Sequence, residues 1–490
     1  MKLTFELDFD ALWHGIKGIA RGFHVEHFLL IYFAVHMLQI AFPSDGSMIF
    51  DEAHYVPASI ATLNGIAANA EHPPLSKIIS AIGIALLGNN WFGWRFPQVL
   101  MQVAFLYVFY LIARRLLRDP WALGATVLLG LDTVFFIHGG ALLIDMAMFL
   151  FGFLSVELYF RKHYVWSAAS MGLAFASREM SIFLFATLAI YHIYANRRSL
   201  KPALKIGLAF TLVALVVFGG LMFAYDLKYQ PAQSTTVTSV LSTNVVLNAS
   251  GQAITTIIIT SESTSNVVIW NPIQHLLFIY HYHGPQGIVI NESYAPYQFA
   301  WNWILPFDPV PYGRYIQPPD PFNSPTYYRV DVDITTDGAT THYTPIWYQA
   351  QANLALWYGF WPALVALGYG LIPRKPEEEN AAPHKDPSDD RTHEQSTIPH
   401  ISQAGLGTRG VALFILSGII LNYVPWLTLS ILVRRIGFNY YMIYTLPFIA
   451  MGLAFAWKLL PQRIGKIAML LNLLLALGFF VWFFPVHPMP

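Results

Sequence analysis

An adjacent pair of carboxylates, Asp51 and Glu52, lies shortly beyond the apolar run FLLIYFAVHMLQIAF, which ends at Phe42. Hydrocarbon cannot solvate a charged side chain, so both acids must face water, a partner or a substrate. A carboxylate placed in this way can act as a general base that takes a proton from a hydroxyl group. The alternative is that the two acids only cap a surface helix, because acidic side chains favour helix N-termini.

Further ionisable residues collect near the ends of other apolar runs. The full set is Asp51, Glu52, His54, Glu71, His72, Lys77, Arg95, Asp145, Arg178, Glu179, Arg434 and Arg435. Ionisable groups near a bilayer are costly and usually mark a site or an ion pair. Because these residues come from separate segments, we expect them to share a polar cavity. The alternatives for any one residue are a local pair, such as Arg178 with Glu179, or a side chain that reaches out to the interface.

A carboxylate opposite several arginines suits the transfer of a sugar from a lipid phosphate. The carboxylate would remove a proton from the acceptor hydroxyl, and the arginines would neutralise the departing phosphate with bidentate hydrogen bonds. A monophosphate carrier requires no divalent metal in principle, so no cofactor is required beyond the lipid-linked sugar, and the sequence leaves metal dependence open. Aromatic rings would hold the sugar, with Trp301 and Trp303 as candidates, although an interfacial aromatic anchor is the alternative for this segment.

Two other interpretations remain open. His54 and His72 lie near the two acids and could form a metal site, but no recognised ligand spacing supports it. A transporter of an anionic solute would use the same acids and arginines along its pathway. Transporters tend to show internal repeats and a site at the bilayer midplane, whereas this sequence shows no repeat and its charges gather at one side.

The composition indicates a polytopic membrane protein. The chain has 490 residues, of which 55% are hydrophobic, and its mean hydropathy is +0.47. Only 11% are charged, against about 25% in soluble domains. The formal net charge is zero, so we expect no nucleic-acid partner. The absence of cysteine excludes disulfides, a thiol nucleophile and a zinc-thiolate site.

Apolar runs long enough to cross a bilayer predict about eleven transmembrane helices. They are 27–43, 96–117, 121–137, 142–160, 164–177, 181–195, 204–225, 353–372, 410–427, 438–458 and 465–484. The weakest part is 164–195, which reads as one broken span or two short ones. Lys and Arg collect in alternate loops, which predicts a cytoplasmic N-terminus and an external site in an integral membrane protein of the plasma membrane or an ER-type membrane.

The polar segments predict the domain organisation. Residues 1–225 form an N-terminal membrane region, in which the external loop 44–95 carries short surface helices. Segment 226–352 is rich in Thr, Val and Ile with turn residues between, which predicts a small, partly β external domain. Residues 353–490 form a C-terminal membrane region interrupted by 373–409, a Pro-rich, charged stretch that is typical of a disordered cytoplasmic linker.

Several motifs together resemble those of one family. FDEAHYVPASIATLNG…EHPPLSKIISAIGIALLGNNWFGWRFP is similar to the first external loop of the dolichyl-phosphate-mannose-protein mannosyltransferases, with an Asp-Glu pair, a His-Pro-Pro stretch and a G-x-R-x-P segment in this order. ALLIDMAMFLFGFLSVELYF, SYAPYQFAWNWILPFDP and PWLTLSILVRRIGFNYYMIYTLPF resemble later segments of the same family. The resemblance implies the GT-C membrane fold and inversion at the anomeric carbon of a sugar, mannose by analogy, carried on a polyprenyl (dolichyl) phosphate.

The resemblance also implies roles for individual residues. Asp51 would be the general base and Glu52 its helper or orienter. Arg95 matches the family's loop arginine, and Arg435, which follows Arg434, matches its C-terminal arginine near the carrier phosphate. These arginines are therefore expected to bind the donor phosphate.

The remaining matches carry weaker implications. Arg178 falls where the family often has a cation, so contact with the phosphate is expected there too. His72 matches the His-Pro-Pro histidine, for which a rigid turn is the alternative, and Asp145 matches an acid that is either structural or part of the site. His54, His72 and Asp145 are candidate substrate-binding residues. Tyr441 departs from the family, which often has His at that position.

The acceptor stays open at this point. Segment 226–352 is too short to hold the β-trefoil module of the eukaryotic family members in addition to its Trp-x-Trp motif. The family implies transfer to Ser or Thr of a protein, and transfer to a lipid or a glycan is the alternative. The expected partners are membrane lipid, the lipid-linked sugar and one of these acceptors.

Overall fold

The computed structural model describes most of the chain. The described residues are 24–42, 48–231, 234–247, 253–266, 271–283, 299–304, 310–315, 332–336, 339–343, 346–373, 407–433, 437–484 and 486–488. The expected linker, apart from residues 373 and 407–409, lies outside these residues, as do Arg434 and Arg435.

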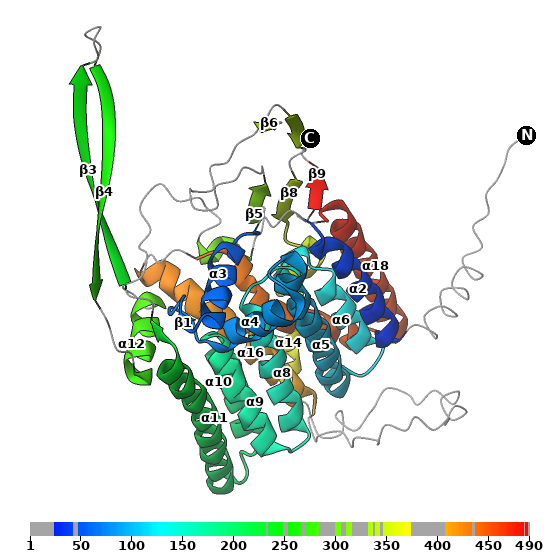
Figure 1. Cartoon of the computed structure of the whole chain (residues 1–490). Helices are drawn as coiled ribbons and strands as arrows, with labels where there is room; N and C mark the ends of the chain where they lie inside the picture. The colour runs from blue at the N-terminus through cyan, green and yellow to red at the C-terminus, as the bar shows by residue number, and fades with distance from the viewer. Residues whose placement is uncertain are drawn as a thin grey trace, which may run out of the picture.

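The described chain is mostly helical (Figure 1). Its helices are α2 (Val25–Ile40), α3 (Glu52–Leu63), α4 (Leu75–Leu87), α5 (Trp91–Leu117), α6 (Trp121–Gly130), α7 (Thr133–Gly140), α8 (Asp145–Phe160), α9 (Tyr164–Ser177), α10 (Ser181–Ala195), α11 (Leu200–Lys228), α12 (Pro272–His283), α13 (Leu354–Trp357), α14 (Phe360–Leu371), α16 (Thr408–Thr428), α17 (Leu446–Leu459) and α18 (Gln462–Trp482). Short turns of other helix types are η2 (Ala300–Asn302), η4 (Leu429–Val433) and η5 (Asn439–Tyr444).

Helices fill every segment that the hydropathy predicted to span a membrane. Among the described residues, 5 helices are long and apolar enough to cross a bilayer, or up to 6 if a bent pair counts as one span. The others are shorter, so the chain is a polytopic α-helical membrane protein, while the predicted number of about eleven spans stays a prediction.

Two of the predicted spans are broken for identifiable reasons. Segment 121–137 forms α6 and α7, which meet at 68°. Asp132 causes this break by capping α7, because its Oδ1 accepts the backbone N–H of Phe135 at 2.8 Å. Segment 164–195 forms two helices, α9 and α10, because Arg178 at the end of α9 takes an extended conformation.

Residues 48–95 of the predicted loop contain the short helices α3 and α4, as the sequence predicted. Helix α3 packs on α4, and α4 packs on α5. Gly93 permits the tight turn between α4 and α5, since a Cβ atom there would lie 2.0 Å from the carbonyl oxygen of Gly88. The loop therefore lies against the N-terminal end of α5, which carries Arg95.

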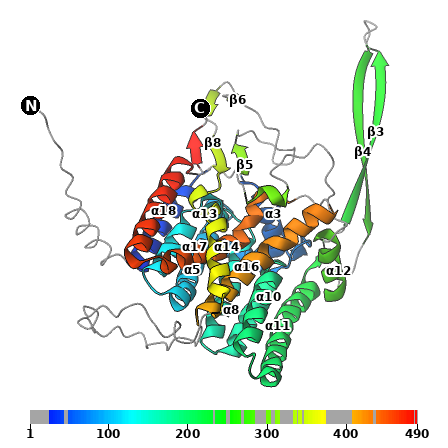
Figure 2. The same cartoon turned by 180° about the vertical axis from the view of Figure 1, so that it is seen from behind.

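Strands occur in segment 226–352, also as predicted. The longest are β3 (Ser234–Leu247) and β4 (Ala253–Asn266), which form an antiparallel hairpin that projects from the helices in both views (Figures 1 and 2). A three-stranded sheet joins β5 (Val310–Tyr315), β8 (Ile346–Ala350) and β9 (Val486–Pro488), and β6 (Val332–Thr336) pairs with β7 (Ala339–Tyr343). Whether these strands make one external domain stays a prediction.

A small parallel pair ties the end of α11 to the loop 44–95. Strand β1 (Ile66–Ala67) pairs with β2 (Gln230–Pro231), which directly follows α11. Helix α12, which the sequence did not predict, is fixed beside this pair, because its His275 lies 2.9 Å from Asp226 at the end of α11. These contacts bring α12 to the loop that carries His72.

Two groups of ion pairs lie at opposite ends of helix α8. At one end, Arg178 after α9 contacts Asp145 at the start of α8. At the other, Arg115 near the end of α5 and Arg161 after α8 both contact Glu157. Helix α8 has 16 residues, so at ~1.5 Å per residue its two ends lie roughly 24 Å apart. Asp145 and Arg178, two of the predicted site residues, thus lie at the end opposite the basic loops.

Candidate functional site

Asp51 is half-buried at the N-terminal end of α3 and is held there by the backbone. Its carbonyl accepts the N–H of His54 at 2.9 Å and of Tyr55 at 3.0 Å. Its carboxylate makes no capping hydrogen bond to α3. The side chain is therefore not used as a helix cap, which favours the interpretation that it faces a substrate.

The surroundings of Asp51 tune its acidity. Burial raises the pKa of the Asp51 carboxyl above its usual value of 3.8. The charges of His54, Arg178, His72 and His138 oppose that rise in pKa, and none of them cancels it. A carboxylate with a raised pKa is a stronger base than an ordinary aspartate, and this is what a general base requires.

Glu52, by contrast, is fully buried and fully paired. Its two oxygens receive Nε and Nη2 of Arg95 at 2.9 and 2.8 Å, the backbone N–H of Ile49 at 2.7 Å and that of Leu142 at 2.8 Å. Arg95 is also buried and donates to the carbonyl of Ile40 at 3.1 Å. This pairing favours an orienting role for Glu52, which is one of the two roles expected of it, and a positioning role for Arg95 over the expected contact with the donor phosphate.

A second buried network holds Arg178 beside the loop. Asp145 accepts hydrogen bonds from the guanidinium of Arg178 and from the hydroxyl of Tyr444, and its other oxygen lies 3.0 Å from Nδ1 of His138. The guanidinium carbon of Arg178 also lies 5.7 Å from the ring centroid of Tyr444. Asp145 is therefore an anchor for Arg178, whereas direct contact with a substrate, as predicted, is not what its burial favours.

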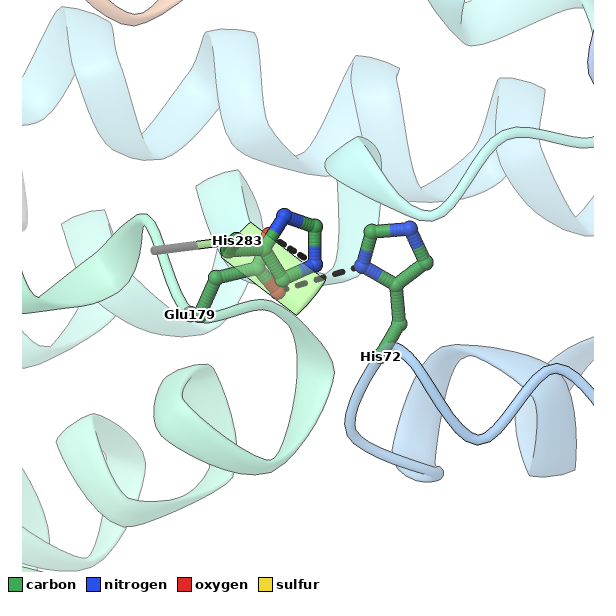
Figure 3. A group of neighbouring side chains, drawn as sticks. All are labelled: His72, Glu179 and His283. Atoms are coloured by element: carbon green, nitrogen blue, oxygen red, sulfur yellow. Dashed lines mark hydrogen bonds and ion pairs between the residues drawn. The ribbon is translucent and has the colours of Figure 1, made fainter. Parts of the chain in front are cut away.

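His72 belongs to a third cluster, which Figure 3 shows. Its Nδ1 lies 3.2 Å from Glu179 and its Nε2 lies 3.3 Å from the hydroxyl of Tyr55. On the other side of Glu179, Nε2 of His283 lies 3.6 Å away and 2.8 Å from the carbonyl of Glu71. The His-Pro-Pro stretch thus does more than form a turn, since its histidine faces a carboxylate. His54, the other predicted histidine, is exposed.

Aromatic side chains pack against one another near the cluster of His72, Glu179 and His283. Tyr441 stacks on Trp426 with ring centroids 4.4 Å apart, and Trp303 meets Tyr441 edge-on at 5.9 Å. Trp303 is 1% exposed, whereas Trp301 is 41% exposed and stacks on Phe299. Of the two predicted sugar-binding tryptophans, Trp303 is therefore a packing residue and Trp301 keeps a free face.

A second aromatic contact reaches the residue before Asp51. The ring of Phe50 meets Tyr440 edge-on at 5.3 Å, and Tyr440 lies 5.6 Å from the ring of His138. Segment 437–444 thus lies directly over the start of α3. Arg434 and Arg435 precede this segment in the sequence, although they fall outside the described residues.

An apolar cavity of about 140 Å³ opens beside the cluster of His72, Glu179 and His283. It lies between α10, α12, α16 and η4, and its lining is Met180, Phe183, His283, Pro425, Trp426 and Leu429. The cavity thus combines an apolar wall with the polar cluster at its edge.

Sequence reasoning missed residues that the fold brings to the site. His138 and Tyr444 hold Asp145, and His283 joins Glu179. His138 had a signal, because it interrupts an apolar run. His283 had none, because its neighbours Glu71 and His72 lie more than 200 residues away in the sequence.

Comparisons with known proteins agree with the sequence motifs. Residues 71–222 match the family described as dolichyl-phosphate-mannose-protein mannosyltransferase. A polyprenol-phosphate-mannose-protein mannosyltransferase of Mycobacterium tuberculosis is 39% identical over 109 residues, which are 20% of this chain and 21% of that protein. The protein of the same name from Mycolicibacterium smegmatis is 35% identical over 124 residues, 23% of this chain and 24% of that protein. The aligned part therefore spans only about a fifth to a quarter of these curated relatives.

One solved structure shares the fold over nearly the whole chain. The S. cerevisiae protein O-mannosyltransferase Pmt1-Pmt2 complex, bound to the sugar donor, has a TM-score of 0.61 with 12% sequence identity. The similarity covers 95% of this chain and 90% of that chain. At this identity it shows the fold, which is GT-C, as the resemblance implied.

Proposed function

Since the chain belongs to the dolichyl-phosphate-mannose-protein mannosyltransferase family, we propose that it is an inverting glycosyltransferase that moves mannose from a polyprenyl phosphate to a hydroxyl acceptor. The observation that carries this proposal is the position of Asp51. It is half-buried with a raised pKa, near the buried cation Arg178 and beside an aromatic layer.

The proposed step needs one base and one group that stabilises the leaving phosphate. Asp51 takes the proton of the acceptor hydroxyl while the oxygen attacks the anomeric carbon of the sugar. The bond from that carbon to the phosphate oxygen breaks, and the electron pair leaves with the lipid phosphate. Attack from the face opposite the phosphate inverts the anomeric configuration. Protein cations opposite Asp51 lower the barrier by offsetting the charge that develops on the phosphate.

The donor would bind at the apolar cavity. Its lining from α10 and α16 suits an isoprenoid chain, and Met180 in that lining follows Arg178 by two residues in the sequence. We propose Arg178, Arg434 and Arg435 as the ligands of the donor phosphate. Arg95 is not among them, because Glu52 occupies its guanidinium.

The remaining predicted residues would act around this centre. His54 lies one turn after Asp51 on α3, is exposed and has a charge that acts on Asp51, so we propose that it contacts the acceptor. Trp301 would provide a stacking surface for a sugar or for the acceptor. Glu52 and Arg95 would hold the start of α3 in place. The described residues place no acid other than Asp51 in a half-buried position at the start of α3.

The acceptor is proposed to be Ser or Thr of a protein, on the external face. The names of the two curated relatives include protein as the acceptor, which favours this choice over a lipid or a glycan. Transport of an anionic solute is the less favoured function, because Glu52 and Arg95 are committed to a buried pair rather than to a pathway.

A transfer assay with purified protein tests the function. The protein is incubated with a panel of radiolabelled polyprenyl-phosphate sugars and with peptides that contain Ser or Thr, lipids or glycans. We expect labelled mannose on a peptide hydroxyl in the inverted configuration. If no donor in the panel loses its sugar to any acceptor, while the protein carries an anionic solute into vesicles, the transferase proposal is wrong.

A further inference from the structure

The cluster of His72, Glu179 and His283 combines three side chains that can each bind a metal ion. Their ligand atoms all lie within 4.8 Å of one another. They come from three separate parts of the chain, namely the loop before α4, the break between α9 and α10, and the end of α12. Figure 3 shows the three side chains pointing toward one another.

We propose that these three side chains bind one divalent transition-metal ion, with Zn²⁺ as the best fit. Two imidazoles and one carboxylate form a donor set that zinc accepts, whereas Ca²⁺ and Mg²⁺ prefer oxygen ligands. Three protein ligands leave one position of a tetrahedral ion for water. This inference does not depend on the proposed transferase function.

The distances require little movement. Tetrahedral zinc with bonds of about 2.0–2.2 Å sets neighbouring ligand atoms roughly 3.3–3.6 Å apart. Nδ1 of His72 already lies 3.2 Å from one oxygen of Glu179, and Nε2 of His283 lies 3.6 Å from the other. Only the wider separations, which reach up to 4.8 Å, have to shorten.

The surroundings orient His72 and leave one oxygen of Glu179 available. A histidine that binds a metal through one ring nitrogen usually donates its other N–H to a neighbour. The hydroxyl of Tyr55, 3.3 Å from Nε2 of His72, provides that neighbour. Oε1 of Glu179 is buried and accepts no hydrogen bond within the described part of the chain, so it is available to a cation.

Binding exchanges one existing bond for another. Nε2 of His283 lies 2.8 Å from the carbonyl of Glu71, where it donates a hydrogen bond. A nitrogen that binds a metal needs its lone pair, so the His283 ring must give up this bond when the ion enters. The helix that carries it stays fixed, because His275 remains paired with Asp226 and with the carbonyl of Ala70 at 2.9 Å.

The ion would cross-link three separate segments at the edge of the site. It would join the loop of His72 to α12 and to the break that carries Arg178, next to Glu179 in the sequence. It would also add positive charge near the edge of the apolar cavity, which His283 lines. A chelator should therefore loosen α12 and the loop together.

Metal content tests the proposal on the full-length protein, purified without a histidine tag. After dialysis against EDTA and then Zn²⁺, we expect about one zinc ion per chain, and no comparable retention of Mg²⁺. Substitution His283→Ala, and separately Glu179→Gln, should reduce retained zinc to the background. The matched control is His281→Ala, because His281 also lies on α12 but is exposed and outside the cluster.

A spectroscopic measurement keeps the test valid if the variants fail to fold. Wild-type protein loaded with Co²⁺ should show the visible absorption of four-coordinate cobalt with imidazole and carboxylate ligands, and Zn²⁺ should displace it. Retention of zinc by both ligand variants, or no stoichiometric zinc and no such cobalt spectrum in wild-type protein, would overturn the proposal. None of these outcomes depends on transferase activity.

Discussion

Glu52 and Arg95 form a bidentate ion pair in which neither side chain is exposed. The pair joins the start of α3 to the start of α5, and Glu52 also holds the backbone of Leu142. Asp51 precedes this pair by one residue, so its position depends on it. Adjacent acids thus do different things, since one is locked in a buried bond and the other is left half-exposed.

Substitution Arg95→Ala should therefore destabilise the protein strongly. It leaves Glu52 as a buried charge without its cation, and breaking a buried pair in this way costs about 3–5 kcal/mol. Thermal or denaturant unfolding in detergent measures the change. The matched control is Arg114→Ala, because Arg114 pairs with Asp119 at 3.4 Å with a side chain that is 47% exposed, and an exposed pair contributes about 0–1 kcal/mol. Equal losses in both variants would contradict the structural role of Arg95.

Substitution Asp51→Asn should abolish most of the sugar transfer and leave the fold intact. The loss of a general base reduces the rate by about 10²–10⁴-fold. Asparagine has nearly the same shape, and no capping hydrogen bond of the side chain is lost. The measurement is kcat for transfer, together with the Kd of the lipid donor, which should change little. Wild-type kcat in folded Asp51→Asn protein would remove this residue as the base.

The same residue predicts a pH dependence. Because the folded-state pKa of Asp51 is raised, the folded protein prefers the neutral form. Its contribution to stability is therefore largest at low pH and is lost as the pH rises through the raised pKa. Asp51→Asn, which is neutral at every pH, should be at least as stable as the wild type at pH 7.

Activity should change with pH in the opposite direction to this contribution to stability, because the base works only when it is ionised. The rate should rise with pH through an apparent pKa above the usual 3.8 of an aspartate. Substitution His54→Gln removes the charge that most opposes the rise in the pKa of Asp51. The acid limb of kcat/KM should therefore move to higher pH. An acid limb that stays at the same pH in this variant would show that Asp51 does not control it.

The sequence predicted the helices well because a long apolar run is a local signal for a helix that can cross a bilayer. It also contained the signal for the break at Asp132, since Asp before a helix is a typical cap. It predicted that polar residues gather at one end, which the contact of Asp145 with Arg178 illustrates. All of these are properties of short stretches of chain.

The partners of the site residues were harder to predict, because they are distant in sequence. Nothing local distinguishes Glu52 from Asp51, and only the fold brings Leu142 to one of them. His283 meets Glu179 because α12 docks on α11, and that docking depends on the pair of His275 with Asp226. Residues of an irregular segment take their places from such long-range contacts.

Substitutions at Arg435 and at the anchor of Arg178 should lower the affinity for the lipid donor to different extents. Arg435→Ala should raise the Kd of the lipid donor with little effect on the KM of the acceptor, because a phosphate contact is lost. Tyr444→Phe removes one hydrogen bond to the Asp145 carboxylate, which costs about 1.5–3 kcal/mol of stability because the acceptor is charged, while Arg178 and His138 stay in contact with Asp145. It should lower donor affinity only through Arg178, so the effect of Arg435→Ala should be larger. Donor affinity that is unchanged in Arg435→Ala protein would exclude the phosphate contact.

The orientation in the membrane can be measured directly, because the chain has no cysteine of its own. Helix α11 has 29 residues, so at ~1.5 Å per residue it is roughly 43 Å long. Its end lies beside β1 through the pairing of β1 with β2. Asn64, just before β1, and Ser199, just before α11, should therefore lie on opposite sides of a bilayer, and both are exposed.

Single variants Asn64→Cys and Ser199→Cys should react differently with a maleimide that cannot cross membranes. In intact cells we expect labelling of Asn64→Cys, and labelling of Ser199→Cys only after the membrane is opened, because the basic loop around Arg197 and Arg198 favours the cytoplasmic side. The wild type, which should stay unlabelled, is the control. Asn64 caps the C-terminal end of α3, and Asp51 caps its N-terminal end, so the reverse pattern would place the base in the cytoplasm and remove the proposal of chemistry on the external face.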